Sequence, residues 1–349
     1  HADRVCDLVA FGDLDWNEVL RAAAFHGVLP IVQHHLNAAA GDLLPEQVKS
    51  YFREYQRTAK MRNAFQVQEL ANVVNTLDRQ GIPTLVMKGP VLAHYAYGDV
   101  NLRQFGDLDI LIPASSFARA VAVLKEEGYV PFQKLADVKG LRKWFYLYLS
   151  GQWPLKRAQG VFNLDLHTRI MPPGYSLPAD FDRYWERSRA IHLEGASMRG
   201  FAPEDLLVVL CYHGIKNQWR LLKHVADVGA LIDSTPTLCW EVVVERAEAA
   251  RGRRVLLLGL MLAHRVMGVP VPSGLRWDMM RDPEIVEVAS ILIASLHSGG
   301  QTGGLDPAQR GRLQLAMQDS FSSRAKYVAY SMMRHVWSSL LKPGKPDNE

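Results

Sequence analysis

Alternating apolar and polar residues indicate two short strands near the middle of the chain. In the segment DLDILI, a period of two places apolar residues on one face and two acids, Asp107 and Asp109, on the other. The segment NLDLH alternates in the same way and places Asn163, Asp165 and His167 together. Both segments are therefore predicted to be strands with one face in the core and one face available for chemistry.

Helical spacing dominates the rest of the sequence. Apolar residues recur every three or four positions through 14–40 and again through 44–80, where Gly81 and Pro83 stop the pattern. A mainly helical pattern returns after the break at Pro172-Pro173-Gly174. These patterns predict an N-terminal helical region 1–80, an α/β core 81–171, a mainly helical C-terminal domain 172–341 and a disordered tail 342–349.

A strand, a turn and a helix are predicted just before the paired acids. Residues 84–87 are extended and apolar, and Lys88-Gly89-Pro90 separates them from the apolar helical segment 91–97. Glycine lets a ligand approach the backbone closely, and proline suits the first helical position. The free amides of a helix start bind phosphate, and Lys88 adds a positive charge there. We therefore expect Lys88 and Gly89 to bind phosphate.

Between the two acidic strands the sequence predicts a hairpin. Residues 144–149 and 152–157 are rich in strand formers, and Ser150-Gly151 supplies a turn between them. An edge hairpin beside the acids would bring the strand 163–167 next to them in antiparallel pairing. Asp165 would then lie across from the first two carboxylates.

Three carboxylates on neighbouring strands predict a divalent metal site. Two acids side by side on a strand repel each other unless a cation lies between them. Carboxylate oxygens are the ligands that Mg²⁺ and Mn²⁺ prefer. We interpret Asp107, Asp109 and Asp165 as the metal ligands. For an isolated Asp-x-Asp step, a polar strand edge facing water is the simpler explanation, and the neighbouring motifs favour the metal site instead.

A polar stripe runs along the apolar helical segment 206–232. Its members recur at intervals of three or four residues: His213, Asn217, Arg220, His224 and Asp227. An exposed helix face explains this spacing as well as the second wall of a pocket does. In the pocket interpretation, His213, Lys216, Asn217 and Lys223 line the wall of a pocket for a phosphate or a base.

Composition narrows the class of protein. The 349 residues are 48% apolar and 22% charged, as in an ordinary folded protein. Lys and Arg number 40 against 36 Asp and Glu, an excess that permits a nucleic-acid partner without indicating one. Three widely spaced cysteines predict reduced thiols and a cytoplasmic location. No apolar run approaches the roughly 20 residues of a membrane helix, so no membrane partner is expected.

The order of these motifs resembles a family of largely uncharacterised bacterial nucleotidyltransferase-like proteins, within the DNA polymerase β nucleotidyltransferase superfamily. The resemblance spans roughly residues 15–235. It rests on Lys88-Gly89, Arg103, Asp107-x-Asp109 and Asp165-Leu166-His167, followed by His213 and Asp227. Where the superfamily usually has Gly-Ser, this chain has Lys88-Gly89, and its gap from Gly89 to Asp107 is longer than usual.

The resemblance implies a fold and an activity. The fold is an α/β (α+β) nucleotidyltransferase core with a small mixed sheet, flanked by N-terminal and C-terminal helical regions. The activity is transfer of a nucleoside monophosphate from a nucleoside triphosphate such as ATP to a small molecule, peptide or protein, with release of pyrophosphate. Mg²⁺ or Mn²⁺ would be held by the catalytic acids Asp107, Asp109 and Asp165. The nucleotide would contact Lys88, Gly89, Arg103 and His167.

Two other functions fit the same residues. In the first, the fold is kept and the nucleotide is added to RNA such as tRNA, as in toxin-like relatives of the superfamily. A concentrated basic face on the helical regions would favour that acceptor. In the second, the chain is a nonenzymatic nucleotide-binding or scaffold protein, although the presence of all three acids argues against a decayed site. The residues specify neither the base nor the acceptor.

Overall fold

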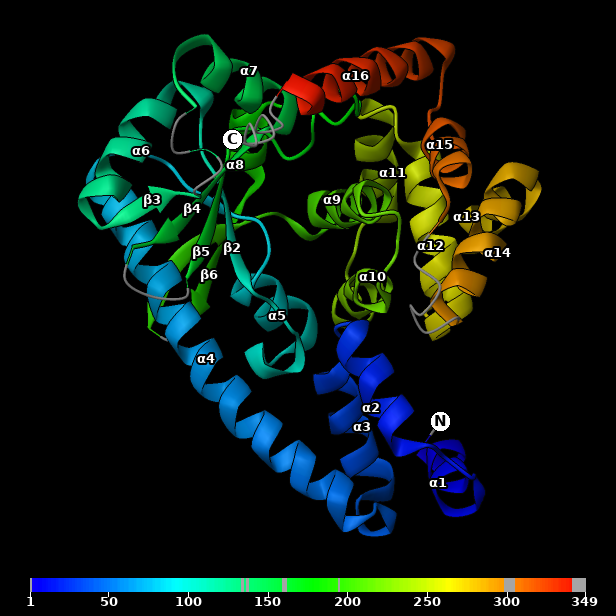
Figure 1. The fold of residues 1–349 in the computed structure, drawn as a ribbon. Coiled ribbons are helices and arrows are strands. Elements are labelled where there is room, and N and C mark those ends of the chain that lie inside the picture. Colours follow the sequence, from blue (N-terminus) through cyan, green and yellow to red (C-terminus); the bar gives the residue numbers. More distant parts are fainter. Residues whose placement is uncertain are drawn as a thin grey trace, which may run out of the picture.

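A seven-stranded mixed sheet lies near the middle of the chain, with helices before and after it (Figure 1). The computed structural model describes residues 2–132, 135, 138–158, 162–193, 195–297 and 305–340. The strands are β1 Leu85–Val86, β2 Asp107–Leu111, β3 Tyr129–Pro131, β4 Gln152–Arg157, β5 Asn163–His167, β6 Arg189–Leu193 and β7 Ala196–Gly200. Their order in the sheet is β3-β4-β5-β2-β1-β7-β6. The expected fold class is confirmed.

Helices form most of the remaining structure. The N-terminal region contains α1 Ala2–Phe11, α2 Trp16–Phe25, α3 Leu29–Ala40 and α4 Glu46–Arg79. Within the core are α5 Pro90–Tyr97, α6 Phe117–Glu126, α7 Gly140–Ser150 and α8 Phe181–Arg187. The C-terminal helices are α9 Pro203–Lys216, α10 Leu222–Ser234, α11 Trp240–Ala249, α12 Arg253–Met267, α13 Ser273–Arg281, α14 Pro283–His297, α15 Pro307–Ala316 and α16 Phe321–Leu340. No described helix is long and apolar enough to cross a membrane.

Strands β2 and β5 pair in parallel, so the predicted antiparallel pairing is wrong. The chain passes through α6, β3, α7 and β4 between them, and such a long crossover lets two strands run in the same direction. The register places Asp109 opposite Asp165 and Leu111 opposite His167. Asp165 therefore lies beside Asp109 as expected, although β5 runs in the opposite direction to the one predicted.

The predicted hairpin over 144–157 is also wrong in its first half. Residues 140–150 form α7, and only 152–157 form a strand. The rings of Trp144 and Tyr148 stack 5.6 Å apart, one helical turn from each other. Gly151 then ends the helix at φ 72°, with its N–H bound to the Leu147 carbonyl. Aromatic strand propensity is overridden here by contacts between residues four apart in a helix.

The sheet extends beyond the segment assigned to the core. Strands β6 and β7 pair with each other, and β7 pairs in parallel with β1. Residues 189–200 therefore belong to the sheet, although they follow the boundary predicted at residue 171. The predicted tail 342–349 lies outside the described residues.

The two faces of the sheet are covered by different helices (Figure 1). Leu108 and Ile110 face a core that includes Leu70 of α4 and Leu124 of α6. On the opposite face, Leu111 belongs to the core that the C-terminal helices build. Because side chains alternate along a strand, Asp107 and Asp109 face these C-terminal helices. The acidic face of β2 is thus opposed by α9 and α10.

A buried tryptophan anchors the loop between α9 and α10. Gln218 and Trp219 both have positive φ, at 58° and 50°, which is unfavourable for residues with side chains. The Trp219 ring is fully buried beside Gly214 and Gly259, and a Cβ atom at Gly214 would lie 2.4 Å from it. Packing of this ring therefore holds the loop in its strained backbone conformation.

We expect Gly214→Ala to lower the free energy of unfolding by about 1–3 kcal/mol, because the added methyl group overlaps the Trp219 ring. Urea denaturation followed by circular dichroism measures the change. Gly274→Ala in α13 is the matched control, since a Cβ atom there meets no other atom within 4 Å. Equal midpoints for the two variants would contradict the proposed anchoring.

Candidate active site

The acids of β2 and β5 form one group with His167. Donor atoms of Asp109, Asp165 and His167 all lie within 4.8 Å of one another. Asp109 and His167 are buried, and Asp165 is partly buried. Asp107 is exposed and lies outside this group, although it lines the same cavities as Asp109. The structure thus brings together two of the three predicted metal ligands and adds a histidine.

Asp109 is held in its ionised form by two neighbours. The Lys88 Nζ atom lies 3.2 Å from Oδ2, and the His167 Nε2 atom lies 3.0 Å from Oδ1. Burial alone would raise the pKa of Asp109, but the Lys88 charge and the His167 hydrogen bond keep this pKa well below its ordinary value. The lysine of the turn therefore supplies one positive charge beside Asp109.

Asp165 has a different environment. Burial raises the pKa of its carboxyl, and the nearby charges of Asp109 and Asp107 raise this pKa further against the effect of His167. The Gln152 side chain donates a hydrogen bond of 2.9 Å to Asp165 and accepts one of 3.2 Å from Lys216. Gln152 was not predicted, since its polar position at the start of β4 does not reveal which strand lies beside it.

The Lys88-Gly89 turn has the predicted conformation. Gly89 precedes α5 with φ 64° and ψ −134°, and Pro90 occupies the first turn of the helix. This backbone conformation strongly favours glycine. Lys88 Nζ contacts His213 Nε2 at 3.0 Å in addition to Asp109. The strand–turn–helix prediction is confirmed, and the turn reaches from the sheet to α9.

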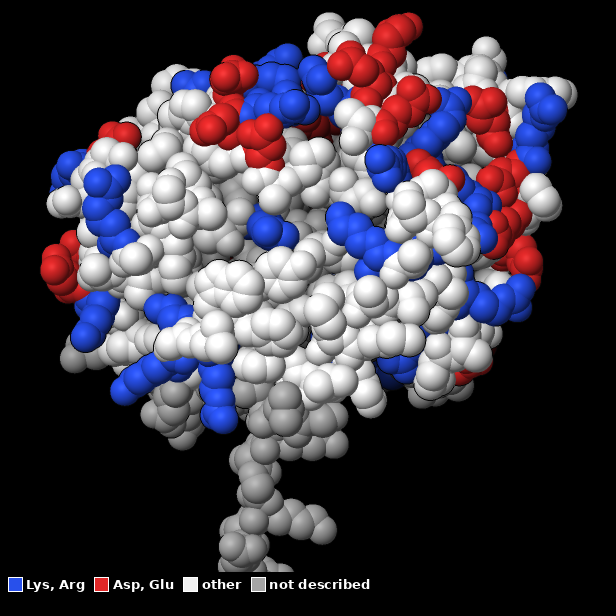
Figure 2. Space-filling view, turned by 90° about the horizontal axis from the view of Figure 1, so that it is seen from above, with Lys and Arg blue, Asp and Glu red and all other residues white. Residues whose placement is uncertain are grey.

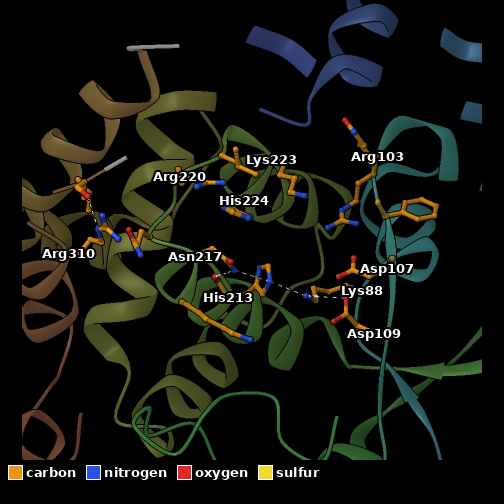
Figure 3. A pocket seen from close by; sticks show the side chains of 17 residues that line it. Lys88, Arg103, Asp107, Asp109, His213, Asn217, Arg220, Lys223, His224 and Arg310 are labelled. Carbon is orange, nitrogen blue, oxygen red and sulfur yellow. Dashed lines mark hydrogen bonds and ion pairs between the residues drawn. The ribbon is translucent and has the colours of Figure 1, made fainter. Parts of the chain in front are cut away.

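The polar stripe forms the second wall of a cavity of about 630 Å³ (Figure 3). The residues that line the cavity on this wall are His213 and Lys216 of α9, Asn217 and Arg220 of the loop, and Lys223 and His224 of α10. The opposite wall includes Lys88, Gly89, Arg103, Asp107 and Asp109. The His224 side chain is buried, and that of His213 is partly buried. These two histidines therefore belong to the wall of a cavity and not to an exposed helix face.

The two histidines of this wall are neutral. Burial, and then the Lys88 charge, hold the pKa of His213 well below its ordinary value, so its Nε2 lone pair accepts the hydrogen bond from Lys88. Burial lowers the pKa of His224 to about 3. Burial and nearby cations also lower the pKa values of Lys216 and Lys223. Cations here lie close together, which favours an anionic ligand.

Arg103 lines the cavity but is already engaged. Its Nε and Nη2 atoms donate to the Asp227 carboxylate at 2.7 and 2.9 Å. The Tyr97 hydroxyl donates to the same carboxylate at 2.9 Å. Although burial alone would lower the pKa of Arg103, Asp227 raises it. Arg103 therefore joins the segment after α5 to α10, and its expected phosphate contact would have to use the remaining guanidinium nitrogen.

A smaller cavity of about 190 Å³ lies on the Asp165 side of the acids. His167 lines this cavity and does not line the larger one. Both cavities share Lys88, Asp107, Asp109, His213, Lys216 and Asn217. The predicted site residues thus surround two adjacent cavities that have these six lining residues in common.

Arg310 was also missed by sequence analysis. It lines the larger cavity from α15, and its Nε atom donates to the Leu305 carbonyl at 2.8 Å. No local motif surrounds it, because its place at the cavity depends on how α15 packs against the other C-terminal helices. Only the folded chain brings it to the site.

The structure thus brings the Lys88-Gly89 turn beside acids on two adjacent strands. The sequence profile of a family described as uncharacterised nucleotidyltransferase matches residues 12–268. The chain therefore belongs to this family, and it is a nucleotidyltransferase. No curated protein matches the chain.

Three solved structures are similar over part of the chain. A crystal structure of ANT(2″)-Ia in complex with adenylyl-2″-tobramycin has 17% identity and a TM-score of 0.36, covering 54% of this chain and 98% of that one. A solution structure of the antibiotic-resistance factor ANT(2″)-Ia has 15% identity and a TM-score of 0.38, covering 59% and 99%. An antigenic nucleotidyltransferase-like protein from Paracoccidioides brasiliensis has 14% identity and a TM-score of 0.32, covering 48% and 75%. The family assignment rests on the sequence profile.

We expect Asp227→Asn to lower the free energy of unfolding by about 3–5 kcal/mol, because it leaves the buried Arg103 charge without its partner. The double variant Arg103→Met, Asp227→Leu should lose less, since it removes both charges together. Urea denaturation at pH 7 measures both variants. Because the pKa of Asp227 is lowered in the folded state, the contribution of this pair is lost as the pH falls through that pKa.

The control is Glu18→Gln, which breaks the exposed pair with Arg21 on α2 and should cost less than about 1 kcal/mol. A double variant less stable than Asp227→Asn would contradict the account of the buried pair.

Proposed function

We propose that this nucleotidyltransferase transfers a nucleoside monophosphate from a nucleoside triphosphate to an acceptor hydroxyl and releases pyrophosphate. One observation carries the proposal: Lys88, Asp109 and Asp165 converge from a phosphate-binding type of turn and two neighbouring strands. The convergence lies between a large cationic cavity and a small one that Asp165 lines. The larger cavity can therefore bind an anion, and Asp165 can remove a proton from a group in the smaller cavity.

The chain's own residues account for phosphate binding. The free amides at the start of α5, the Lys88 ammonium, and the lysines of the opposite wall, Lys216 and Lys223, provide positive charge around the larger cavity. Phosphoryl-type transfer is catalysed mostly by positioning and by stabilising charge. These cations would hold the triphosphate and stabilise the departing pyrophosphate.

The donor set fits a divalent cation. Asp109 and Asp165 offer carboxylate oxygens and His167 a nitrogen within 4.8 Å, and Asp107 offers a further carboxylate on the same strand face. Oxygen donors suit Mg²⁺ or Mn²⁺, and the contact with Asp109 lets His167 orient that ligand. A bound cation would neutralise phosphate charge and make the acceptor hydroxyl more acidic. We assign Asp107, Asp109 and Asp165 as the residues that hold it.

Asp165 is placed to receive the acceptor proton. Burial and the neighbouring carboxylates raise its pKa, so it binds a proton more readily than Asp109 does. Gln152 fixes its orientation through the 2.9 Å hydrogen bond. A carboxylate with raised pKa, held in one orientation, suits general-base catalysis.

The face drawn in Figure 2 has no continuous basic surface of the kind that would bind a long RNA. On the face drawn in Figure 2, Lys and Arg stand among Asp and Glu along much of the margin, and they do not form one continuous basic surface. Proteins that bind nucleic acid usually cluster basic residues on one face or along one helix. A small molecule, a peptide or a protein side chain fits this one face better.

Lys88→Ala should weaken binding of nucleoside triphosphates by about 1–3 kcal/mol, because it removes a charge-assisted contact. Binding of nucleoside monophosphates should change much less, since the lysine is assigned to the distal phosphates. Isothermal titration in Mg²⁺ with each triphosphate and monophosphate measures both effects. Lys60→Ala, an exposed position on α4, is the control. Equal weakening for both nucleotides would exclude this role of Lys88.

Asp165→Asn should keep triphosphate binding within several-fold of the wild type and abolish transfer. The reason is that the Asp165 carboxylate is needed when the acceptor loses its proton, whereas the nucleotide is held mainly by the other residues. Transfer of label from each triphosphate into a cell lysate, beside a binding titration, separates the two effects. Asp182→Asn, exposed on α8, should change neither. Undiminished transfer by Asp165→Asn would exclude the base role, and no transfer by the wild type would overturn the proposed function.

A further inference from the structure

Helices α7 and α16 expose a group of apolar side chains at one end of the molecule (Figure 1). The two helices touch through the Phe145 and Trp337 rings, whose centroids lie 4.9 Å apart. The large exposed apolar residues of α7 and of positions 328–337 in α16 are Leu141, Trp144, Val328, Met332, Met333 and Val336. We call these six residues the apolar ridge.

The ridge lies on the side of α16 that faces solvent. Val328, Met332 and Val336 recur every four residues, so their side chains form one stripe along the helix. Tyr330, on the opposite side of the helix, is buried. In the stripe 64% of Met332 is exposed, and on α7 60% of Trp144 is exposed. Because apolar surface is unfavourable in water, a group of exposed apolar side chains of this kind indicates a binding partner.

Basic residues accompany the ridge. Residues 139–150 and 321–340, which include α7 and α16, together contain six Lys or Arg and no Asp or Glu, whereas the net charge of the whole chain is +4. The six are Lys139, Arg142, Lys143, Arg324, Lys326 and Arg334. Arg324 also lies 3.9 Å from Glu284 of α14. Figure 2 views this end of the molecule, where single Lys and Arg side chains lie in an uncharged central area and Asp and Glu lie toward the margin. The partner should therefore offer both apolar area and negative charge.

Two other kinds of partner match these properties less well. In a symmetric dimer the ridge of one copy would face the ridge of the other, and the cations of the two copies would repel each other. Single-stranded RNA stacks its bases on aromatic rings, and five of the six ridge residues are not aromatic. An anionic lipid surface supplies acyl chains for the ridge and phosphates for the cations.

We infer that the apolar ridge of α7 and α16 docks on an anionic membrane surface. The ridge enters the boundary between headgroups and acyl chains, Trp144 lies at the level of the headgroups, and the neighbouring Lys and Arg side chains contact lipid phosphates. A helix docked in this way lies in the plane of the membrane and need not cross it. The expectation of no membrane partner considered only helices that span a membrane, so it does not bear on this surface. The inference is independent of the proposed function.

The docking surface is separate from the cavities of the candidate active site. None of the six ridge residues lines either of the two cavities, so a membrane and a nucleotide can bind at the same time. Helix α7 nevertheless ends at Ser150, two positions before Gln152, whose side chain donates to Asp165. Docking would therefore hold the Asp165 side of the site close to the membrane surface.

Vesicle sedimentation with the full chain tests the inference. The probes are vesicles of phosphatidylcholine alone and vesicles in which phosphatidylserine replaces part of it. We expect the protein to sediment with the phosphatidylserine vesicles and much less with phosphatidylcholine alone. Added salt should weaken this binding, because it screens the attraction between the cations and the lipid. No binding to phosphatidylserine vesicles at low salt would overturn the inference.

A pair of serine substitutions tests the ridge without changing the charge. Trp144→Ser combined with Met332→Ser should weaken binding to phosphatidylserine vesicles by about tenfold or more, because less apolar area enters the membrane. The matched control combines Trp277→Ser and Met280→Ser on α13, where 63% and 59% of the wild-type residues are exposed. Equal binding by the two double variants would contradict the assignment. If the ridge pair does not fold, Met332→Ser alone decides.

A second pair tests the charges beside the ridge. Arg142→Gln combined with Lys326→Gln should weaken binding to phosphatidylserine vesicles and make it less sensitive to salt. The control combines Lys60→Gln and Lys125→Gln, exposed positions on α4 and α6, and should leave binding within about twofold of the wild type. Undiminished binding by the Arg142, Lys326 variant would contradict the role of these cations.

The remaining outcomes identify a different partner. A wild-type dimer that Trp144→Ser with Met332→Ser converts to a monomer would assign the ridge to a second copy of the chain and overturn the inference. Tighter binding to poly-glutamate than to phosphatidylserine vesicles would assign it to an acidic protein instead. Triphosphate binding should be unchanged in every variant, because none of these residues lines a cavity of the site. Failure of vesicle binding would thus leave the proposed function standing, and absence of nucleotide transfer would leave the docking surface standing.

Discussion

The contact between the Lys88 ammonium and the buried Asp109 carboxylate is the interaction on which the site depends. A buried carboxylate without a cation is costly, and this lysine compensates it from the turn before α5. The same ammonium contacts His213 on α9, so it also joins the sheet to the helical wall. The acidic face of β2 is thereby compatible with folding even though apolar helices cover most of that side of the sheet.

Local patterns in the sequence predicted the parts of the site that lie close together in the chain. Alternation along β2 was sufficient to separate Asp107 and Asp109 from the core face, and the Gly89-Pro90 step was sufficient to locate the start of α5. Side-chain direction in a strand and the conformational freedom of glycine are local properties, so single-sequence patterns report them well. The 34-residue α4 was recognised for the same reason.

Features that depend on distant parts of the chain were not predictable in this way. The direction of β5 follows from a crossover of several elements, and Arg103 is drawn to Asp227, which lies 124 positions away. Gln152 and Arg310 reach the site only because β4 and α15 pack where they do. Even a local signal failed at α7, since aromatic residues that favour strands also stack along one side of a helix.

Trp219 fixes the loop after α9 independently of any ligand. Its ring occupies the space beside Gly214 and Gly259, and the backbone at Gln218 keeps its left-handed conformation. A wall that is rigid in advance loses little conformational entropy when a substrate binds to it. The same rigidity leaves the wall little ability to adapt, so we expect relatives with other substrates to differ by exchanged side chains around the cavities rather than by movement of this loop.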